Sequence, residues 1–118
     1  LPISLQLQER SISVSALLDT GSAVNVLPYD IGVKMGAVWE RQTTTVQLTG
    51  NLASEPARVL TVTGRVGTLP SARLVFAWTR ANTVPIILGQ VNFFMEFDVC
   101  FYRSRSLFEV KSKTVVGG

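Results

Sequence analysis

The stretch that decides the fold is Leu17-Leu18-Asp19-Thr20-Gly21-Ser22. It places a carboxylate directly after an apolar run, on a turn that contains a glycine. Before it, Ile12, Val14 and Ala16 alternate with polar residues, which predicts a strand that ends at Asp19. A carboxylate held rigidly at the end of a strand is suited to acid/base chemistry. The same residues are also typical of an Asx turn, in which Asp19 only caps its own loop. The stretch alone leaves both interpretations open.

Most of the remaining chain also has the pattern of strands. Alternation of apolar and polar residues predicts strands over 3–7, 12–16, 43–48, 57–66 and 74–78, and a buried apolar strand over 85–89. Turn residues separate them at 9–10, 49–51 and 67–70. Pro28 and Gly36 punctuate a short helix over 29–35. A second short helix is expected over 90–97 and a final hairpin over 99–110. These patterns favour an all-β barrel or sandwich with minor helix.

Composition excludes several classes of protein. The chain of 118 residues is 47% hydrophobic and contains no histidine, which rules out a Ser-His-Asp triad, a Cys-His pair and histidine-ligated zinc. A single cysteine excludes an internal disulfide. The sequence has no phosphate-binding loop, nucleotide fingerprint or metal-ligand cluster, so neither a cofactor nor a metal is expected. The net charge is +3 with scattered basic residues, and no nucleic-acid partner is expected. Trp39 and Trp78 are interpreted as packing residues rather than as a ligand platform.

The location of the protein is suggested by what the sequence lacks. The longest apolar run, Val84 to Leu88, is far shorter than the roughly 20 residues of a membrane span. No signal peptide is recognisable. The lone cysteine fits a reducing compartment, so a cytoplasmic location is favoured. The chain begins with Leu1 instead of Met, and we expect further sequence upstream of it.

A second motif follows the first at a distance. Ile86-Ile87-Leu88-Gly89 ends seventy positions after Asp19, and a glycine-tipped hairpin is predicted between them, over 43–63. In these features the sequence resembles the retropepsin-like aspartic proteases, in which a D-T-G-S loop, a flap hairpin, an I-L-G strand and a helix occur in this order. The segments 18–36 and 98–110 resemble the cellular and retrotransposon branch of that family. The resemblance implies a small closed barrel with a flap and one or two short helices, formed by residues 1–118 as a single domain.

The resemblance also implies roles for individual residues. Asp19 would be the catalytic carboxylate, Thr20 would hydrogen-bond across two D-T-G loops, Gly21 would admit the substrate backbone, and Ser22 would donate its hydroxyl to the aspartate. Substrate-binding residues would come from the flap and the I-L-G strand: Leu48, Thr49, Gly50, Asn51, Leu52 and Ile87. Because the mechanism needs two carboxylates that share a proton and this chain has one D-T-G, the enzyme would be a homodimer.

The sequence departs from retroviral members of the family at two coupled positions. Ala23 and Gln90 stand where those enzymes carry an aspartate and an arginine that form an ion pair. Both charges are missing together, so no unpaired buried charge remains. We expect an aspartic endopeptidase with an acidic pH optimum that acts on a peptide or protein substrate. The alternatives are a catalytically weak or silent dimeric module for peptide binding or assembly, and a protease domain excised from a larger polypeptide.

Overall fold

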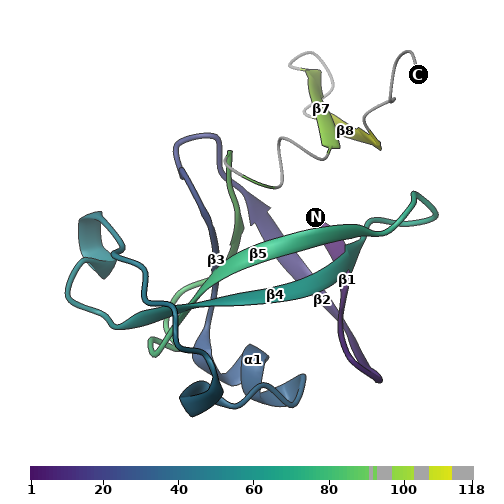
Figure 1. Ribbon diagram of the computed structural model, residues 1–118. Helices are drawn as coiled ribbons and strands as arrows, with labels where there is room; N and C mark the ends of the chain where they lie inside the picture. Colours follow the sequence, from purple (N-terminus) through teal and green to yellow (C-terminus); the bar gives the residue numbers. More distant parts are fainter. Residues whose placement is uncertain (91, 93–96, 103–106, 113–118) are drawn as a thin grey trace, which may run out of the picture.

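The computed structural model describes residues 1–90, 92, 97–102 and 107–112 (Figure 1). Strands form a closed barrel in the order β1-β2-β6-β3-β5-β4, and β7 pairs with β8 in a separate two-stranded sheet. The barrel strands are β1 (Pro2–Leu7), β2 (Arg10–Leu18), β3 (Asn25–Leu27), β4 (Ala57–Arg65), β5 (Ala72–Thr79) and β6 (Ile86–Leu88). The other elements are α1 (Tyr29–Lys34), the 3₁₀ turns η1 (Trp39–Arg41) and η2 (Gly50–Leu52), and β7 (Phe97–Tyr102) and β8 (Leu107–Ser112). The prediction of an all-β closed barrel with short helices is confirmed.

The barrel is built from two long hairpins and two parallel pairs. Strands β1 and β2 pair antiparallel up to Leu7 and Arg10, so their turn consists of Gln8 and Glu9, one position before the predicted turn. Strands β4 and β5 pair antiparallel along nearly their whole length. By contrast, β2 pairs parallel with β6, and β3 pairs parallel with β5. Strand β6 therefore lies between β2 and β3, although these two strands follow each other in the chain.

The helix α1 begins at Tyr29, as predicted, and ends at Lys34, one residue before the predicted end. Pro28, at the N-cap, has an extended conformation with φ −67°, and its missing N–H is not needed there. After Met35, Gly36 has a φ of +85°, which favours glycine because it lacks a Cβ. Gly32 is buried in the middle of the helix, directly against the indole ring of Trp78. The helix can therefore approach the barrel closely only because this position has no side chain.

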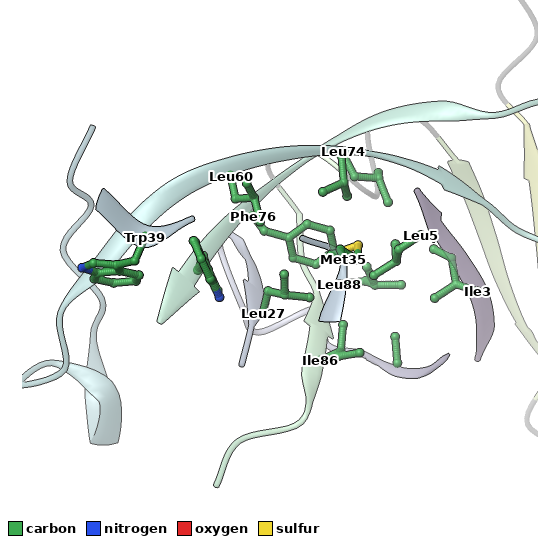
Figure 2. Close-up of a cluster of buried hydrophobic side chains, with 13 residues drawn as sticks. Ile3, Leu5, Leu27, Met35, Trp39, Leu60, Leu74, Phe76, Ile86 and Leu88 are labelled. Carbon is green, nitrogen blue, oxygen red and sulfur yellow. The ribbon is translucent and has the colours of Figure 1, made fainter. Parts of the chain in front are cut away.

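The core fills the inside of the barrel. Its buried side chains come from every barrel strand, from Met35 directly after α1 and from Trp39 in η1 (Figure 2). Leu5, Leu74, Phe76 and Leu88 have no exposed surface, and burial of each such side chain contributes roughly 1.5–3 kcal/mol relative to its exposed state. The barrel is thus held by one apolar cluster shared among all of its strands.

The two tryptophans belong to an aromatic group at one side of the core. Trp78 is 0% exposed and Trp39 8% exposed. Tyr29 stacks on Trp78 with ring centroids 5.5 Å apart, and Trp39 meets Trp78 edge to face at 5.2 Å. The indole N–H of Trp78 donates to the carbonyl of Tyr29 at 3.0 Å. Trp78 is a packing residue, as predicted. Trp39 also packs in the core, but its ring reaches the surface and lines a cavity.

Three predicted elements differ from the structure or lie outside it. The strand predicted over 43–48 is wrong: its pairing with β4 is a single bridge between Thr45 and Arg58. Beyond this bridge the side-chain amide of Gln47 donates to the carbonyls of Leu48 and Ala53, so local hydrogen bonds take the place of a strand ladder. The helix predicted over 90–97 falls mainly on residues 91 and 93–96, outside the described residues, and Phe97 begins β7. The predicted final hairpin is confirmed and is longer than expected, since β7 starts at Phe97 and β8 ends at Ser112.

The close approach of α1 to the barrel makes Gly32→Ala a test of this packing. Alanine favours a helix over glycine by about 1 kcal/mol. Its Cβ would, however, overlap the buried indole of Trp78, and overpacking of a core typically costs about 1–3 kcal/mol. We expect Gly32→Ala to lower the free energy of unfolding by about 1–2 kcal/mol, measured by urea denaturation. Val33→Ala, at an exposed position of the same helix, should change it by less than about 0.5 kcal/mol. A Gly32→Ala variant more stable than the parent contradicts this packing.

Candidate active site

The loop after β2 crosses the end of β6. Because β2 and β6 run parallel, with Leu18 opposite Leu88, Asp19 and Gly89 emerge at the same edge of the barrel. The N–H of Asp19 donates to the carbonyl of Leu88 at 3.1 Å, and the N–H of Gln90 donates to the carbonyl of Ser22 at 2.9 Å. The side-chain amide of Gln90 also donates to the carbonyl of Thr20. The D-T-G-S loop is thus fixed to β6 and the residues after it at three points.

Gly89 is the residue over which this loop passes. A Cβ at position 89 would lie 2.8 Å from the carbonyl oxygen of Ser22 and closer still to that of Val24. Real Cβ atoms essentially never come so near to another heavy atom. The glycine that ends the I-L-G motif is therefore required for the loop to cross the strand.

The buried side-chain amide of Asn25 also holds this crossing in place. Asn25 is 0% exposed, and its Oδ1 accepts the N–H of Gly89 at 2.8 Å. Its Nδ2 donates to the carbonyl of Val75 at 3.0 Å and to Oδ1 of Asn92 at 2.9 Å. The Asn92 oxygen also accepts the N–H of Val75 at 2.8 Å. The polar atoms of Asn25 are thus satisfied although water cannot reach them, as a buried polar group requires.

The sequence interpretation missed Asn25, Asn92 and the support given by Gln90. One signal was present: Asn25 interrupts the apolar run of Val24, Val26 and Leu27. A polar residue within a buried strand indicates that its side chain forms hydrogen bonds inside the protein. No such signal marked Gln90, which follows the strand and is exposed.

The Asp19 side chain is half-buried, and one of its two carboxylate oxygens accepts a hydrogen bond. Its Oδ1 accepts the N–H of Gly21 at 2.9 Å, and the carbonyl of Asp19 accepts the N–H of Ser22 at 3.1 Å. This is the geometry of an Asx turn. Among the described residues nothing donates to the other oxygen, Oδ2. The two interpretations of the motif are therefore compatible, because the turn orients the carboxylate and leaves one oxygen free.

One predicted contact of this loop is wrong in the single chain. The hydroxyl of Ser22 donates to the carbonyl of Val24 at 2.7 Å, whereas the resemblance implied that it donates to Asp19. A hydroxyl has one hydrogen to donate, so the bond within the loop excludes the other. Ser22 stiffens the turn between β2 and β3 in this structure.

A cleft of about 330 Å³ opens beside Asp19. Of the predicted site residues, it brings together Asp19, Gly21, Ser22, Leu48, Thr49, Leu52 and Ile87. Three others do not line it: Thr20, Gly50 and Asn51 are exposed outside it. Further lining comes from Ala23, Val24, Val26 and Gln47. The lining is mixed: apolar side chains such as Leu48, Leu52 and Ile87 alternate with polar groups of Ser22, Gln47 and Thr49. It joins the two motifs to the segment 43–57.

The segment 43–57 lies against the barrel as a long loop. The N–H of Val46 donates to the carbonyl of Ala57 at 3.0 Å, and that of Val59 donates to the carbonyl of Thr44 at 2.8 Å. Beyond this short pairing, the side-chain amide of Gln47 donates to the carbonyls of Leu48 and Ala53 at 3.1 and 2.7 Å. The side chain of Gln47 thus donates hydrogen bonds to main-chain carbonyls that a neighbouring strand would otherwise satisfy. Gly50, with a φ of +63°, begins the 3₁₀ turn at its tip.

Neither a metal site nor a membrane helix is found in the part of the chain that the structure describes. Within these residues no three His, Cys, Asp or Glu side chains come together as ligands for an ion. Over the same residues, no helix is long and apolar enough to cross a membrane.

Comparison with known proteins bears on the fold. No protein-family model matches the chain, and no curated protein matches it significantly in sequence. Among solved structures, it is similar to a crystal structure described as a retropepsin-like aspartic protease from Rickettsia conorii, with a TM-score of 0.60. The two sequences are 14% identical, and the similarity covers 94% of this chain and 83% of the other. The chain therefore has the retropepsin-like fold.

Substitution of the buried amide tests whether the loop crossing depends on it. Asn25→Leu keeps the size of the side chain but leaves the N–H of Gly89 without its acceptor. An unsatisfied buried polar group costs about 1–3 kcal/mol, and the carbonyl of Val75 loses a donor as well. We expect the free energy of unfolding to fall by roughly 2–4 kcal/mol, measured by urea denaturation. Asn51→Leu, at an exposed position, is the control and should have little effect. Equal stability of Asn25→Leu and the parent would show that this network does not hold the loop.

Proposed function

We propose that the chain is an aspartic endopeptidase that is active as a homodimer. The observation that carries the proposal is the Asp19 carboxylate. Among the described residues no group donates to its second oxygen, and it lines a cleft from a loop fixed by several hydrogen bonds. A rigid loop keeps a carboxylate in the position that acid/base catalysis requires. The similarity to a solved retropepsin-like aspartic protease supports the same conclusion.

The proposed mechanism needs the Asp19 residues of two chains. In aspartic proteases one carboxylate accepts a proton from the attacking water, while the other, protonated, polarises the scissile carbonyl. Two carboxylates about 3 Å apart share one proton, and activity is confined to the pH range in which the pair holds it. We therefore expect an acidic optimum. A two-fold axis beside the D-T-G-S loops would bring the pair together, and the exposed Thr20 of each chain would hydrogen-bond to the other loop.

The proposed substrate is an extended peptide bound between the D-T-G-S loop and the segment 43–57. Leu48, Leu52 and Ile87 line the cleft next to the carboxylate, which favours apolar side chains beside the scissile bond. Gly21 carries no side chain beside Asp19, so a peptide backbone can come close. In this proposal Thr49, Gly50 and Asn51 cover the bound peptide, and their main-chain groups pair with it as an added strand would.

Helix α1 supports the proposal that this chain belongs to the cellular and retrotransposon branch of the family. This chain resembles that branch in having a helical turn shortly after the D-T-G-S loop, where α1 begins at Tyr29. Gln90 supports the loop through Thr20 and Ser22, so the loop does not depend on the ion pair that retroviral enzymes have. No metal or cofactor takes part in the proposed reaction.

The substitution Asp19→Asn tests the proposal. Asparagine keeps an Oδ1 that can accept the N–H of Gly21, but it cannot serve as a base. We expect hydrolysis of a fluorogenic peptide library with apolar central residues to fall by roughly 10³-fold or more. The thermal unfolding temperature should change by only about 2 °C or less, since the turn is retained.

Two other outcomes decide against the proposal. If Asp19→Asn cleaves peptides as fast as the parent, Asp19 is a turn residue and the proposed chemistry is wrong. If the parent protein binds library peptides without cleaving them between about pH 3 and 7, the silent binding module replaces the enzyme.

A further inference from the structure

A second and larger cavity opens next to the Asp19 cleft. It has a volume of about 620 Å³, and its walls come from Trp39, the segment 45–47, the segment 55–58 and Arg80. Gln47 lines both this cavity and the Asp19 cleft. The two hollows therefore adjoin each other at Gln47, on the segment 43–57.

Two arginines in this cavity are held in place by aromatic rings. The guanidinium of Arg58 lies 4.7 Å from the ring centre of Trp39 and donates to the carbonyl of that residue at 2.7 Å. The guanidinium of Arg80 lies 4.7 Å from the ring of Tyr29 and 5.3 Å from that of Trp39. Both rings pack on the fully buried Trp78. Stacked guanidiniums of this kind lose little freedom when they bind a further group.

The charge in the cavity is not balanced. Arg58 and Arg80 contribute two positive charges, and Glu55 is the one carboxylate among the lining residues. Within the described part of the chain, neither guanidinium has a carboxylate at ion-pairing distance. An arginine presents five N–H donors in a planar fork that matches a carboxylate. The cavity thus offers unused donors, a net positive charge and room for a side chain.

We propose that this cavity binds an acidic side chain, glutamate or aspartate, of the peptide whose scissile bond lies beside Asp19. The inference rests on the proposed function and adds a substrate class to it: peptides with apolar residues at the scissile bond and an acidic residue several positions away. An extended peptide rises about 3.3 Å per residue, so moving the acidic residue along the peptide in single steps locates its distance from the scissile bond. The Asp19 cleft supplies the apolar contacts, and Arg58 and Arg80 supply the charged contact.

The test uses matched peptides and the full chain. The peptides are identical except for a single glutamate, or a glutamine in the matched control, which is moved along the sequence. Their binding to the Asp19→Asn variant is measured by fluorescence anisotropy at about pH 6, where glutamate is charged. At one position we expect glutamate to be bound roughly 3- to 10-fold more tightly than glutamine. The preference should weaken in high salt. It should also vanish as the pH falls below about 4, where glutamate becomes protonated while arginine stays charged.

Variants of Arg80 identify the site of this preference. Arg80 is exposed, so its substitution disturbs the core little. Arg80→Gln, in the Asp19→Asn background, should reduce the ratio of glutamate to glutamine binding to below about twofold, and Arg80→Lys, which keeps the charge, should preserve part of it. Arg65→Gln, an exposed arginine at the far end of β4, should leave the ratio unchanged. An equal loss in Arg65→Gln would assign the preference to net charge and overturn the inference.

Failure of the inference differs from failure of the proposed function. If the parent cleaves neutral peptides and the glutamate preference is absent at every position, the enzyme stands and the acidic subsite is wrong. If no peptide is cleaved but the Asp19→Asn variant still prefers glutamate through Arg80, the subsite belongs to a peptide-binding module and the proposed enzyme is wrong.

Discussion

The crossing of the D-T-G-S loop over Gly89 is the constraint on which the rest of this site depends. Because β6 lies between β2 and β3, the chain can pass from one to the other only over the end of β6. Gly89 leaves the space, and Asn25 satisfies its N–H from within the barrel. The residues after β6 then hold the loop through the carbonyls of Thr20 and Ser22. The position of the Asp19 carboxylate follows from this crossing.

The same crossing explains why a single chain offers only half of the proposed catalytic site. The loop satisfies one oxygen of Asp19 through the N–H of Gly21 and directs the carboxylate to the edge of the barrel. The nearest apolar wall comes from the segment 43–57, which packs through Leu48 on the outside of β3 and β6. A single chain thus has a positioned carboxylate beside a cleft that apolar side chains line in part. In the proposed mechanism the second carboxylate comes from another chain.

The sequence carried enough information to predict the barrel but not every detail of the site. Alternation with a period of two marked the long strands, because one face of each is buried. The two motifs were recognised in the sequence, but the crossing of Asp19 and Gly89 is seen only in the structure. Side-chain hydrogen bonds with several competing acceptors were less predictable. The hydroxyl of Ser22 donates to the carbonyl of Val24 instead of to Asp19. In the segment predicted as one strand of a hairpin, the side chain of Gln47 donates to main-chain carbonyls where a neighbouring strand was expected. Such choices depend on tertiary geometry, which a linear pattern does not encode.

The central claim is that each catalytic unit contains Asp19 from two chains, and a mixing experiment tests it most directly. Parent and Asp19→Asn protein are mixed in equal amounts at constant total concentration, dissociated and re-associated, and the rate of peptide hydrolysis is compared with that of the parent alone. If both carboxylates are needed, only dimers of two parent chains are active, and the rate falls to about one quarter. A rate of about one half would mean that each chain works with its own Asp19 and would contradict the account.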